Sequence, residues 1–358
     1  MKLCIISLGG YSSRLIAQEA RELFSSVEEV KINEIEVRAG KDGFKVLHDG
    51  IELSNFDCVY LRGSYKYAIL QRAITEALLG KCYMPFKPDS FFLGRDKLLT
   101  ILELQKYNIN IPKTYLASTI KVAKKILEEV EFPIIIKIPS GTHGKGVMSA
   151  DSIESAKTIL DVLEVFKQPY IIQEFIDTGA EDIRVIVAGD SIVGCMKRKG
   201  MKGDIRANIH QGGVGMIHNL KPEERELAIR TARAIKAEIV GVDILESFRG
   251  PMVIEANLSP GLRGIMEVTK KNMARDIASY LFERSKEFKE TKLANGAKNV
   301  LKDLTKKHEN GILMNLDIRL DTIRIPPEIT KITGFTKERD VLLTADKGKL
   351  TIKNSEDF

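Results

Sequence analysis

Three oxygen-bearing side chains, Asp243, Glu255 and Asn257, lie on two apolar stretches that the sequence predicts to form one β-hairpin. The residues between these stretches, 247–250, can close as a three-residue turn with Gly250 in the left-handed conformation. In that register Asp243 lies directly opposite Glu255, and Asn257 shares their face because side chains alternate along a strand. Carboxylate and amide oxygens suit Mg²⁺ bound together with phosphate, whereas a solvated sheet face is the simpler interpretation.

A second group of residues could bind phosphate directly. Lys137 stands in the apolar stretch 133–138, where a buried ammonium group needs an anion, and a glycine-rich loop follows at 140–146. Backbone N–H groups of such a loop can approach a phosphate closely. The loop is not a Walker A motif because Lys145 is followed by Gly146, and a plain β-turn beside a snorkelling lysine is the alternative. The glycines of this loop are Gly141, Gly144 and Gly146.

Polar residues at predicted strand ends give two weaker signals. Gln173 and Glu174 end one apolar strand and Asp182 begins the next. Backbone groups at such ends could hold a flat base, and an acidic side chain could accept from a ribose hydroxyl. A basic, donor-rich segment follows, which could hold a transferring phosphoryl group or an oxyanion, or could equally be a solvated loop. Its donors include Arg198, Arg206 and Asn208.

The composition is that of a globular protein with more than one compact unit. The chain has 358 residues, 44% of them hydrophobic, a net charge of +6 and a pI near 8.9. Its charges are interspersed, so nucleic-acid binding is not implied by charge alone. No stretch approaches the ~20 apolar residues of a membrane span and the first apolar run is too short for a signal peptide, so we expect a cytoplasmic protein. Four scattered cysteines argue against a disulfide scaffold or a zinc site and are expected to be buried.

Helical and strand patterns alternate along most of the chain. An apolar strand at 3–8 and a helix at 13–24 give a βα start, and further helices and strands alternate up to the hairpin. Residues 289–310 are rich in lysine and glutamate and are interpreted as a linker or a weak helix. After them, residues 312–353 alternate between apolar and polar, with two strands joined at 346–348.

Taken in order along the chain, these residues closely resemble the ATP-grasp superfamily, specifically the RimK-like amino-acid ligases. The resemblance spans about residues 55–285. Its most specific stretches are 95–97, 141–147, 203–210, 241–245 and 255–261. It implies an α/β (α+β) fold of the ATP-grasp class with a small β-rich C-terminal domain. The implied domains are an N-terminal pre-ATP-grasp α/β domain at 1–90, an ATP-grasp domain at 91–288 with subdomains at about 91–172 and 173–288, a linker at 289–310 and the tail at 311–358.

The resemblance also implies roles for individual residues. ATP would lie between two α/β halves, with Lys97 and Lys137 on its phosphates and Asp182 near the ribose. The backbone from Glu174 to Ile176 would hold adenine. The ATP-binding set implied in this way is Lys97, Lys137, Gly141, Gly144, Gly146, Gln173, Glu174, Phe175, Ile176, Asp182, Arg206 and Asn208. The implied ligands of Mg²⁺, with Mn²⁺ as the alternative ion, are Asp243, Glu255 and Asn257. The implied catalytic residues are Arg198, at the acyl-phosphate oxygens, with Arg206 and Asn208.

The implied reaction joins a carboxylate to an amine. The carboxylate attacks the γ-phosphate of ATP to form an acyl phosphate, and an amine then displaces phosphate. The amine would belong to an amino acid such as glutamate, and the acceptor carboxylate to a protein C-terminus or a coenzyme. Residues expected near the amino acid are Ser259, Gly261 and Arg263, although a surface role for this arginine is the alternative.

The last 45 residues or so resemble an AbrB-type swapped-hairpin domain, a dimeric unit often used to bind DNA. A regulatory ATP-binding protein with a DNA-binding tail is therefore the alternative function. Basic residues of the tail are balanced by acidic ones, which disfavours DNA. A short sheet buries little by itself, so we expect the tail to dimerise or to dock a substrate, and the protein to be a homo-oligomer.

Overall fold

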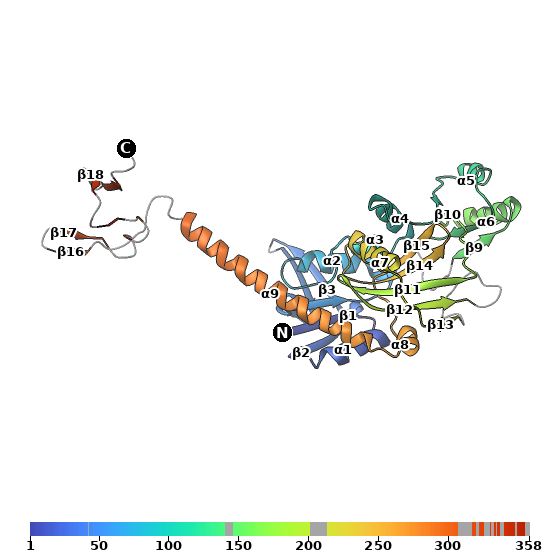
Figure 1. Cartoon of the computed structure of the whole chain (residues 1–358), viewed down its shortest axis with the longest axis horizontal. Helices are drawn as coiled ribbons and strands as arrows, with labels where there is room; N and C mark the ends of the chain where they lie inside the picture. The colour runs from blue at the N-terminus through green and yellow to red at the C-terminus, as the bar shows by residue number, and fades with distance from the viewer. Residues whose placement is uncertain are drawn as a thin grey trace. The chain divides into compact units, whose positions relative to one another are not determined.

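The computed structural model describes most of the chain, which divides into two compact units, Met1–Ala294 and Asn295–Phe358 (Figure 1). The described residues are 1–41, 43–139, 146–200, 213–306, 317–319, 322–325, 330, 333, 335–336, 340–347 and 349–354. Within these ranges, no helix combines the length and the apolar character that crossing a membrane requires.

The first unit begins with a small parallel sheet. The elements of this N-terminal part of the chain, in order, are β1 (Lys2–Ser7), α1 (Tyr11–Ala20), β2 (Ser26–Lys31), η1 (Ile32–Glu34), β3 (Glu36–Gly40), β4 (Gly43–His48), β5 (Ile51–Glu52), η2 (Leu53–Asn55), β6 (Cys58–Leu61), η3 (Tyr65–Tyr67) and α2 (Ala68–Leu78). Strand β1 pairs in parallel with both β2 and β6, and its apolar residues are fully buried. Gly9, with a φ of 73°, allows the chain to turn from β1 into α1. Strands β3, β4 and β5 form a separate antiparallel sheet.

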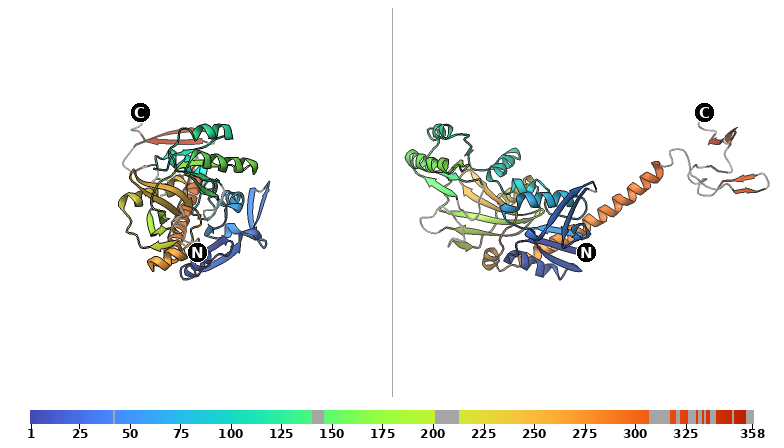
Figure 2. Two further views of the ribbon diagram at one scale, coloured as in Figure 1. Left: turned by 90° about the vertical axis from the view of Figure 1, so that its right-hand side faces the viewer. Right: turned by 180° about the vertical axis from the view of Figure 1, so that it is seen from behind.

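A four-stranded sheet follows, in the order β7-β10-β8-β9. Its elements are β7 (Thr114–Tyr115), α5 (Ile120–Ile126), β8 (Ile134–Lys137), β9 (Val147–Ala150), α6 (Ile153–Val165) and β10 (Ile171–Glu174). Ile134, Ile136 and Ile172 point to one face and pack with residues of α5 and α6 in a core of their own. Both helices lie on that side of the sheet (Figure 2). The alternation of side chains therefore leaves Lys137 and Gln173 on the opposite face.

A five-stranded antiparallel sheet carries the predicted hairpin, in the order β13-β12-β11-β14-β15. Its elements are β11 (Glu181–Ala188), β12 (Ser191–Lys199), β13 (Val214–Met216), α7 (Pro222–Ala234), β14 (Ile239–Ser247) and β15 (Gly250–Asn257). Apolar residues such as Ile183, Val185 and Ile244 are fully buried in the main core, which includes Leu227 and Ala228 of α7. The polar residues of these strands alternate with the apolar ones and so gather on the other face.

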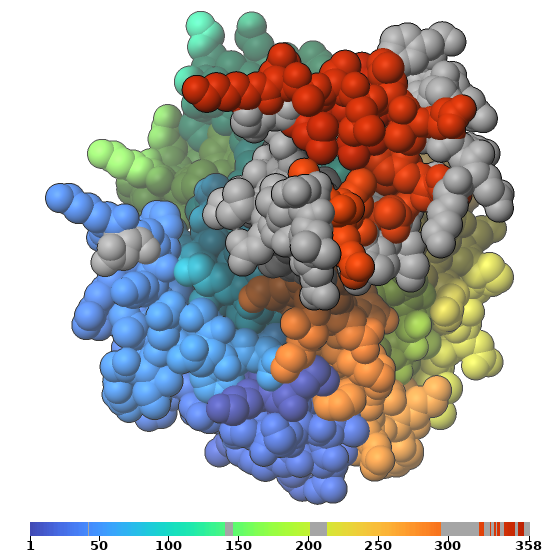
Figure 3. Space-filling view, turned by 90° about the vertical axis from the view of Figure 1, so that its left-hand side faces the viewer, coloured from blue at the N-terminus to red at the C-terminus, as the bar shows by residue number. Residues whose placement is uncertain are grey.

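Four helices join these sheets to one another. They are α3 (Ser90–Leu93), α4 (Lys97–Lys106), α8 (Arg263–Thr269) and α9 (Met273–Lys306). The first part of α9 packs against the N-terminal sheet, where the rings of Phe282 and Phe24 meet edge to face at 5.2 Å and Lys289 lies 2.8 Å from Asp57. Figure 3 shows this part of α9, in orange, beside the N-terminal segment in blue. Residues 289–306, interpreted above as a linker or weak helix, belong to α9.

The second unit contains two short antiparallel hairpins. These are formed by β16 (Asp317–Arg319) with β17 (Thr322–Arg324), and by β18 (Val341–Asp346) with β19 (Lys349–Asn354). Asp346 pairs with Lys349 at the end of the β18–β19 ladder, beside the turn that the sequence predicts. Apolar side chains of both hairpins are exposed, among them Ile323 at 44% and Leu343 at 57%.

Candidate active site

The β14–β15 hairpin places Asp243 opposite Glu255, which confirms the predicted pairing. Gly250 has a φ of 93°, as the predicted turn requires. Ser247 pairs with Gly250, so the loop between the strands is one residue shorter than predicted. Further along the ladder, Ile254 has no partner on β14. This bulge restores the predicted register. The pairing of the two carboxylates therefore depends on the bulge as well as on the turn.

Asp243 is held by two arginines on the polar face of the sheet. Arg184 donates from Nε and Nη2 to its two oxygens at 2.7 and 2.6 Å, and Nη2 of Arg198 lies 2.9 Å from Oδ2. Arg198 also donates twice to Asp182, both times at 2.6 Å. Asp182, Arg198 and Asp243 are at most 7% exposed. The result is a buried cluster of two carboxylates and two guanidinium groups whose formal charges cancel.

The charges within this cluster shift the pKa values of its members. Burial raises the pKa of Asp243, but Arg184 and Arg198 outweigh it and hold the pKa below its ordinary value. Burial also raises the pKa of Asp182, and here Arg198 does not compensate fully, so the pKa stays above its ordinary value. Burial lowers the pKa of Arg198, but Asp243 and Asp182 raise it by more. Asp243 is therefore the more firmly ionised of the two carboxyl groups.

Three residues for which the sequence suggests separate roles form ion pairs with one another in the structure. Asp182 is expected at a ribose, Arg198 at an acyl phosphate and Asp243 at a metal ion, yet in this state they bind one another. Arg184 is absent from the predicted site. Its signal in the sequence is its position two residues after Asp182, which puts both side chains on one face of β11.

Lys137 lies on the four-stranded sheet and contacts a neutral partner. Its Nζ donates to Oε1 of Gln173 at 2.5 Å, and Nε2 of Gln173 donates to Oγ1 of Thr114 at 2.8 Å. Burial lowers the pKa of Lys137 to about 8, an effect that Glu255 opposes and Lys97 strengthens. An amide oxygen does not neutralise an ammonium charge, so Lys137 remains suited to an anion.

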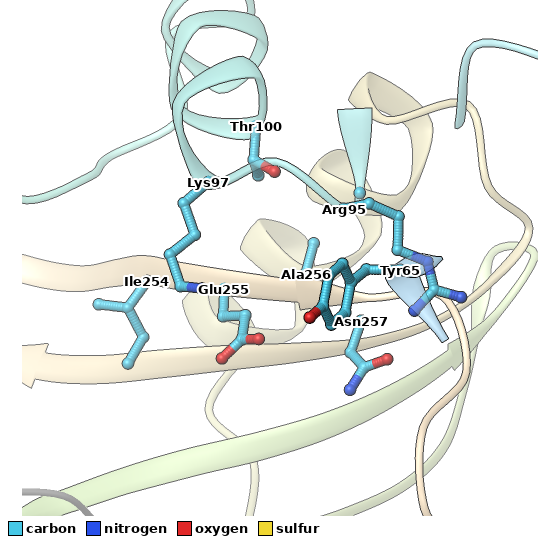
Figure 4. A pocket seen from close by; sticks show the side chains of 9 residues that line it. Tyr65, Arg95, Lys97, Thr100, Ile254, Glu255, Ala256 and Asn257 are labelled. Atoms are coloured by element: carbon cyan, nitrogen blue, oxygen red, sulfur yellow. The ribbon is translucent and has the colours of Figure 1, made fainter. Parts of the chain in front are cut away.

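A pocket lies between the start of α4 and strand β15. Asp96 caps α4 by accepting from the N–H groups of Leu98 and Leu99 at 2.9 and 3.0 Å, which fixes Lys97 as the first helical residue. In Figure 4 the Lys97 side chain extends from α4 toward β15, at the position of Glu255. Polar residues that line this pocket are Tyr65, Arg95, Lys97, Thr100, Glu255 and Asn257. A cationic and an acidic group thus share one cavity.

The residues at the end of β10 are already partly engaged. The Glu174 carboxylate accepts from the N–H of Lys113 at 2.6 Å and pairs with Arg249 at 2.7 Å. The Glu174 N–H donates to the carbonyl of Lys113 at 2.9 Å. Phe175 and Ile176 follow the strand and are half-buried. A flat base at this edge would therefore meet the backbone of Phe175 and Ile176 rather than the Glu174 N–H.

The loop after β15 connects the pocket to the N-terminal sheet. The Ser259 N–H donates to Oδ1 of Asn257 at 3.0 Å, and Oγ of Ser259 accepts from the Gly63 N–H at 3.0 Å. The guanidinium of Arg263 lies over the ring of Tyr11, 4.3 Å from its centre, a cation–π contact. This contact supports the surface alternative for Arg263.

The remaining predicted residues fall into two groups. Gly261 has open space where a side chain would begin, and Gly146, with a φ of 79°, accepts from the Ile138 N–H at 2.9 Å. Four predicted residues lie outside the described part of the chain: Gly141, Gly144, Arg206 and Asn208.

The oxygen atoms of the hairpin side chains suit a divalent cation once Asp243 is released from its arginine partners. Glu255 and Asn257 offer carboxylate and amide oxygens, which Mg²⁺ prefers. The oxygens of Asp243 accept from Arg184 and Arg198, so a cation would have to replace part of that contact. Within the described ranges no three His, Cys, Asp or Glu side chains are grouped to hold a metal.

Comparison with known proteins gives consistent matches. The family described as RimK-like ATP-grasp domain matches residues 94–281. A probable alpha-L-glutamate ligase of Cellvibrio japonicus is 31% identical over 83% of this chain and 100% of that protein. Another, from Syntrophotalea carbinolica, is 34% identical over 67% of this chain and 80% of that protein.

Solved structures show the same architecture at lower identity. A RimK domain protein ATP-grasp from Sphaerobacter thermophilus superposes with a TM-score of 0.59 at 17% identity, covering 78% of this chain and 99% of that one. The ATP-grasp ligase PsnB, complexed with minimal precursor, Mg and ADP, gives 0.62 at 15% identity, covering 80% of this chain and 98% of that one. The predicted ATP-grasp fold is thereby confirmed.

Proposed function

Since this chain belongs to the RimK-like ATP-grasp ligase family, we propose that it joins an amino acid, glutamate or a similar one, to a carboxylate through an acyl phosphate. The observation that carries this proposal is the meeting of Lys97, Glu255 and Asn257 in one pocket, with the charge of Glu255 acting on Lys137. Cations for phosphates and oxygen ligands for a metal are thus close together. The relatives named alpha-L-glutamate ligases support glutamate as the amino acid.

The proposed binding of ATP uses both sheets. Lys97 and Lys137 contact the phosphates, and a phosphate beside Lys137 supplies the anion that its amide partner does not provide. The backbone at Phe175 and Ile176 holds the base. The rest of the proposed ATP-binding set is the one assigned by resemblance above, and Asp182 reaches the ribose only after releasing Arg198.

The proposed metal site consists of Asp243, Glu255 and Asn257. A bound Mg²⁺ would neutralise charge on the transferring phosphoryl group. The protein's own residues would change partners. Once Asp243 no longer accepts from them, Arg184 and Arg198 would donate to phosphate oxygens. Arg198 then stabilises the oxygens of the acyl phosphate and of the tetrahedral species that follows.

The test is formation of ADP by the purified full chain supplied with Mg-ATP and with L-glutamate, which serves both as the amine and as the trial carboxylate. Glu255→Gln keeps the shape of the side chain but removes a charged ligand, and it should lower ADP formation at least 100-fold. Glu267→Gln, a change in α8 outside this pocket, is the matched control and should leave the rate within twofold. Undiminished ADP formation by Glu255→Gln would contradict the metal assignment.

The acceptor is proposed only as a class, a carboxylate on a protein C-terminus or on a coenzyme. Incubation of a cell extract with ATP, labelled glutamate and the protein, followed by mass spectrometry, should give one acceptor heavier by one or more glutamyl residues. We propose the cytoplasm as the location of the protein, because ATP is available there.

For the second unit we propose a role in self-association. Its hairpins expose apolar residues on strands too short to build a core by themselves. The exposed apolar residues are Ile323, Ile325, Val341, Leu342, Leu343 and Leu350. A second copy of the same hairpins can cover them, which favours a homo-oligomer over DNA binding.

A further inference from the structure

Two arginines meet at the junction between the N-terminal sheet and the loop after β15. Arg62 is 4% exposed, and all three hydrogen bonds of its side chain go to neutral groups. Its Nε donates to Ser13 Oγ at 3.1 Å, its Nη1 to Tyr60 OH at 3.0 Å and its Nη2 to the Pro260 carbonyl at 2.7 Å. Arg62 therefore joins the loop to the sheet, and none of these partners neutralises its positive charge.

Arg95 is the neighbour of Arg62 and lines the pocket itself. Its Nη2 donates to the Gly63 carbonyl at 2.6 Å and lies 3.2 Å from Ser259 Oγ, again two neutral partners. Its Nε is buried and makes no hydrogen bond. Burial lowers the pKa of Arg95 to about 10, and the positive charge of Arg62 adds to this effect. Arg95 is thus a partly buried cation whose buried Nε lacks an acceptor.

This junction differs from the cluster around Asp243, where carboxylates balance the arginines. Among the described residues no carboxylate pairs with Arg62 or Arg95. Buried polar atoms without hydrogen bonds also gather here: of four such side-chain atoms in the described chain, three belong to Arg95 and Gln71. A side chain at Gly63 would come within 3.0 Å of Gln71, so these atoms flank one glycine. Two neighbouring cations without a carboxylate partner, one buried and one partly buried, are costly unless an anion joins them.

The shape of the junction suits a planar anion. A guanidinium presents its donors as a fork that matches a carboxylate. Leu258 packs so closely on Gly94 that a side chain there would meet it at 2.8 Å, which holds the backbone beside Arg95 in place. The pocket that Arg95 lines also contains Glu255 and Asn257, so an anion at Arg95 would lie next to the proposed reaction centre.

We propose that Arg95, positioned beside Arg62 and Ser259, binds the α-carboxylate of the incoming glutamate, whose amine is the group that reacts. This inference rests on the proposed ligase function and assigns its amino-acid site. This contact holds the amino acid beside Ser259, whose N–H is bonded to Asn257 of the proposed metal site. The amine of the amino acid is thereby directed toward the acyl phosphate.

The test is calorimetric titration of the full chain, loaded with Mg²⁺ and a non-hydrolysable ATP analogue, with L-glutamate and with 4-aminobutanoate. The second compound is glutamate without its α-carboxylate. Wild-type protein should bind L-glutamate at least tenfold more tightly than 4-aminobutanoate. Arg95→Gln should bind L-glutamate at least tenfold more weakly and discriminate less than twofold, while its affinity for the nucleotide changes less than twofold.

Arg233→Gln is the matched control, since Arg233 is 64% exposed and pairs with Asp190 away from this pocket. It should behave as wild type. Arg95→Lys keeps the charge but loses the fork, and an intermediate loss of glutamate affinity is expected even if Arg95→Gln is poorly folded.

Three results would overturn the inference. Unchanged glutamate affinity in Arg95→Gln would make Arg95 a structural link only. An equal loss of nucleotide affinity would mean that the phosphates are the anion. Wild-type protein that binds the nucleotide but not glutamate would refute the glutamate site, whereas failure of the ligase proposal would appear separately as absence of ADP formation.

Discussion

Asp243 is the residue whose surroundings say most about how this site works. It is 3% exposed, ionised and bound by Arg184 and Arg198, so it stabilises the fold in the state described here. The same carboxylate is proposed to bind a metal ion. Glu255, its partner in the ladder, lines the pocket and is less buried. The two carboxylates should therefore respond differently to the loss of charge.

Asp243→Asn should lower the free energy of unfolding by about 3–5 kcal/mol, because it leaves the buried Arg198 and the partly buried Arg184 with a single carboxylate. Glu255→Gln should change it by less than about 1 kcal/mol. Urea unfolding of both variants without nucleotide measures this difference. Equal stabilities would show that the arginine pairs contribute nothing to the fold.

Lys137 gives a prediction about pH. Its pKa of about 8 lies below the ordinary value, so the unliganded protein loses this proton as the pH rises above 8. A bound phosphate favours the charged form and raises the pKa, so binding takes up a proton above pH 8. The affinity for Mg-ATP should fall by up to tenfold per pH unit between about 8 and 10.

Calorimetry at pH 8.5 in two buffers of different ionisation enthalpy measures the proton uptake. Lys137→Arg keeps its charge over this range and is the control, because it should bind without proton uptake at this site. The same uptake in Lys137→Arg would assign the proton to another group.

At the scale of elements, the hairpin and the loop that follows it form the site together. Gly241 on β14 lies so close to Pro260 that a Cβ atom would come within 2.9 Å of the proline ring. A proline ring cannot move aside by changing rotamer as a flexible side chain does. The packing of this glycine therefore holds Ser259 and Pro260 in position beside Arg62 and Arg95.

Gly241→Ala should displace the loop, with a stability cost of about 1–3 kcal/mol and at least a tenfold loss of ADP formation. Gly40→Ala, in a place where a Cβ atom meets nothing within 4 Å, is the control and should change neither. Thermal unfolding and the ADP assay measure the two effects. Wild-type activity in Gly241→Ala would show that the loop accommodates the methyl group.

Patterns within short segments predicted much of this site, but they did not predict contacts between residues far apart in the sequence. The turn at Gly250 predicted that Asp243 lies opposite Glu255, although the register also needs a bulge that no local pattern indicates. The position of Lys137 in an apolar stretch predicted a buried cation, whose lowered pKa agrees with that prediction. The bond from Arg184 to Asp243 joins residues on strands far apart in the sequence, and no local pattern reports which strands pair. Strands β3 and β4 were missed because most of their side chains are exposed and lack a clear apolar alternation.

At the scale of the whole molecule, the second unit should set the oligomeric state. A chain ending at Lys306 keeps the contacts of α9 with the N-terminal sheet, which lie before Ala294, but loses both hairpins. By light scattering after gel filtration, the full chain should be an oligomer and the shortened chain a monomer of unchanged melting temperature. Leu343→Asp in the full chain should also dissociate it.

An oligomer that persists without the hairpins would contradict this role. Salt-dependent binding of duplex DNA to the full chain, lost in the shortened one, would instead support the regulatory alternative.

The placement of the four cysteines makes them a ready means of following the protein in solution. Cys4, Cys58 and Cys82 are buried in the N-terminal core, where a reagent in solution cannot reach their thiols. Burial raises the pKa values of all four cysteines, so exposure is what distinguishes them. Cys195 on β12 is only half-buried, and its side chain is directed to the His218 carbonyl, behind the face that carries Arg198. A thiol-specific fluorophore would therefore label this one site first, giving an optical reporter on the reverse of the catalytic sheet without any engineering of the sequence.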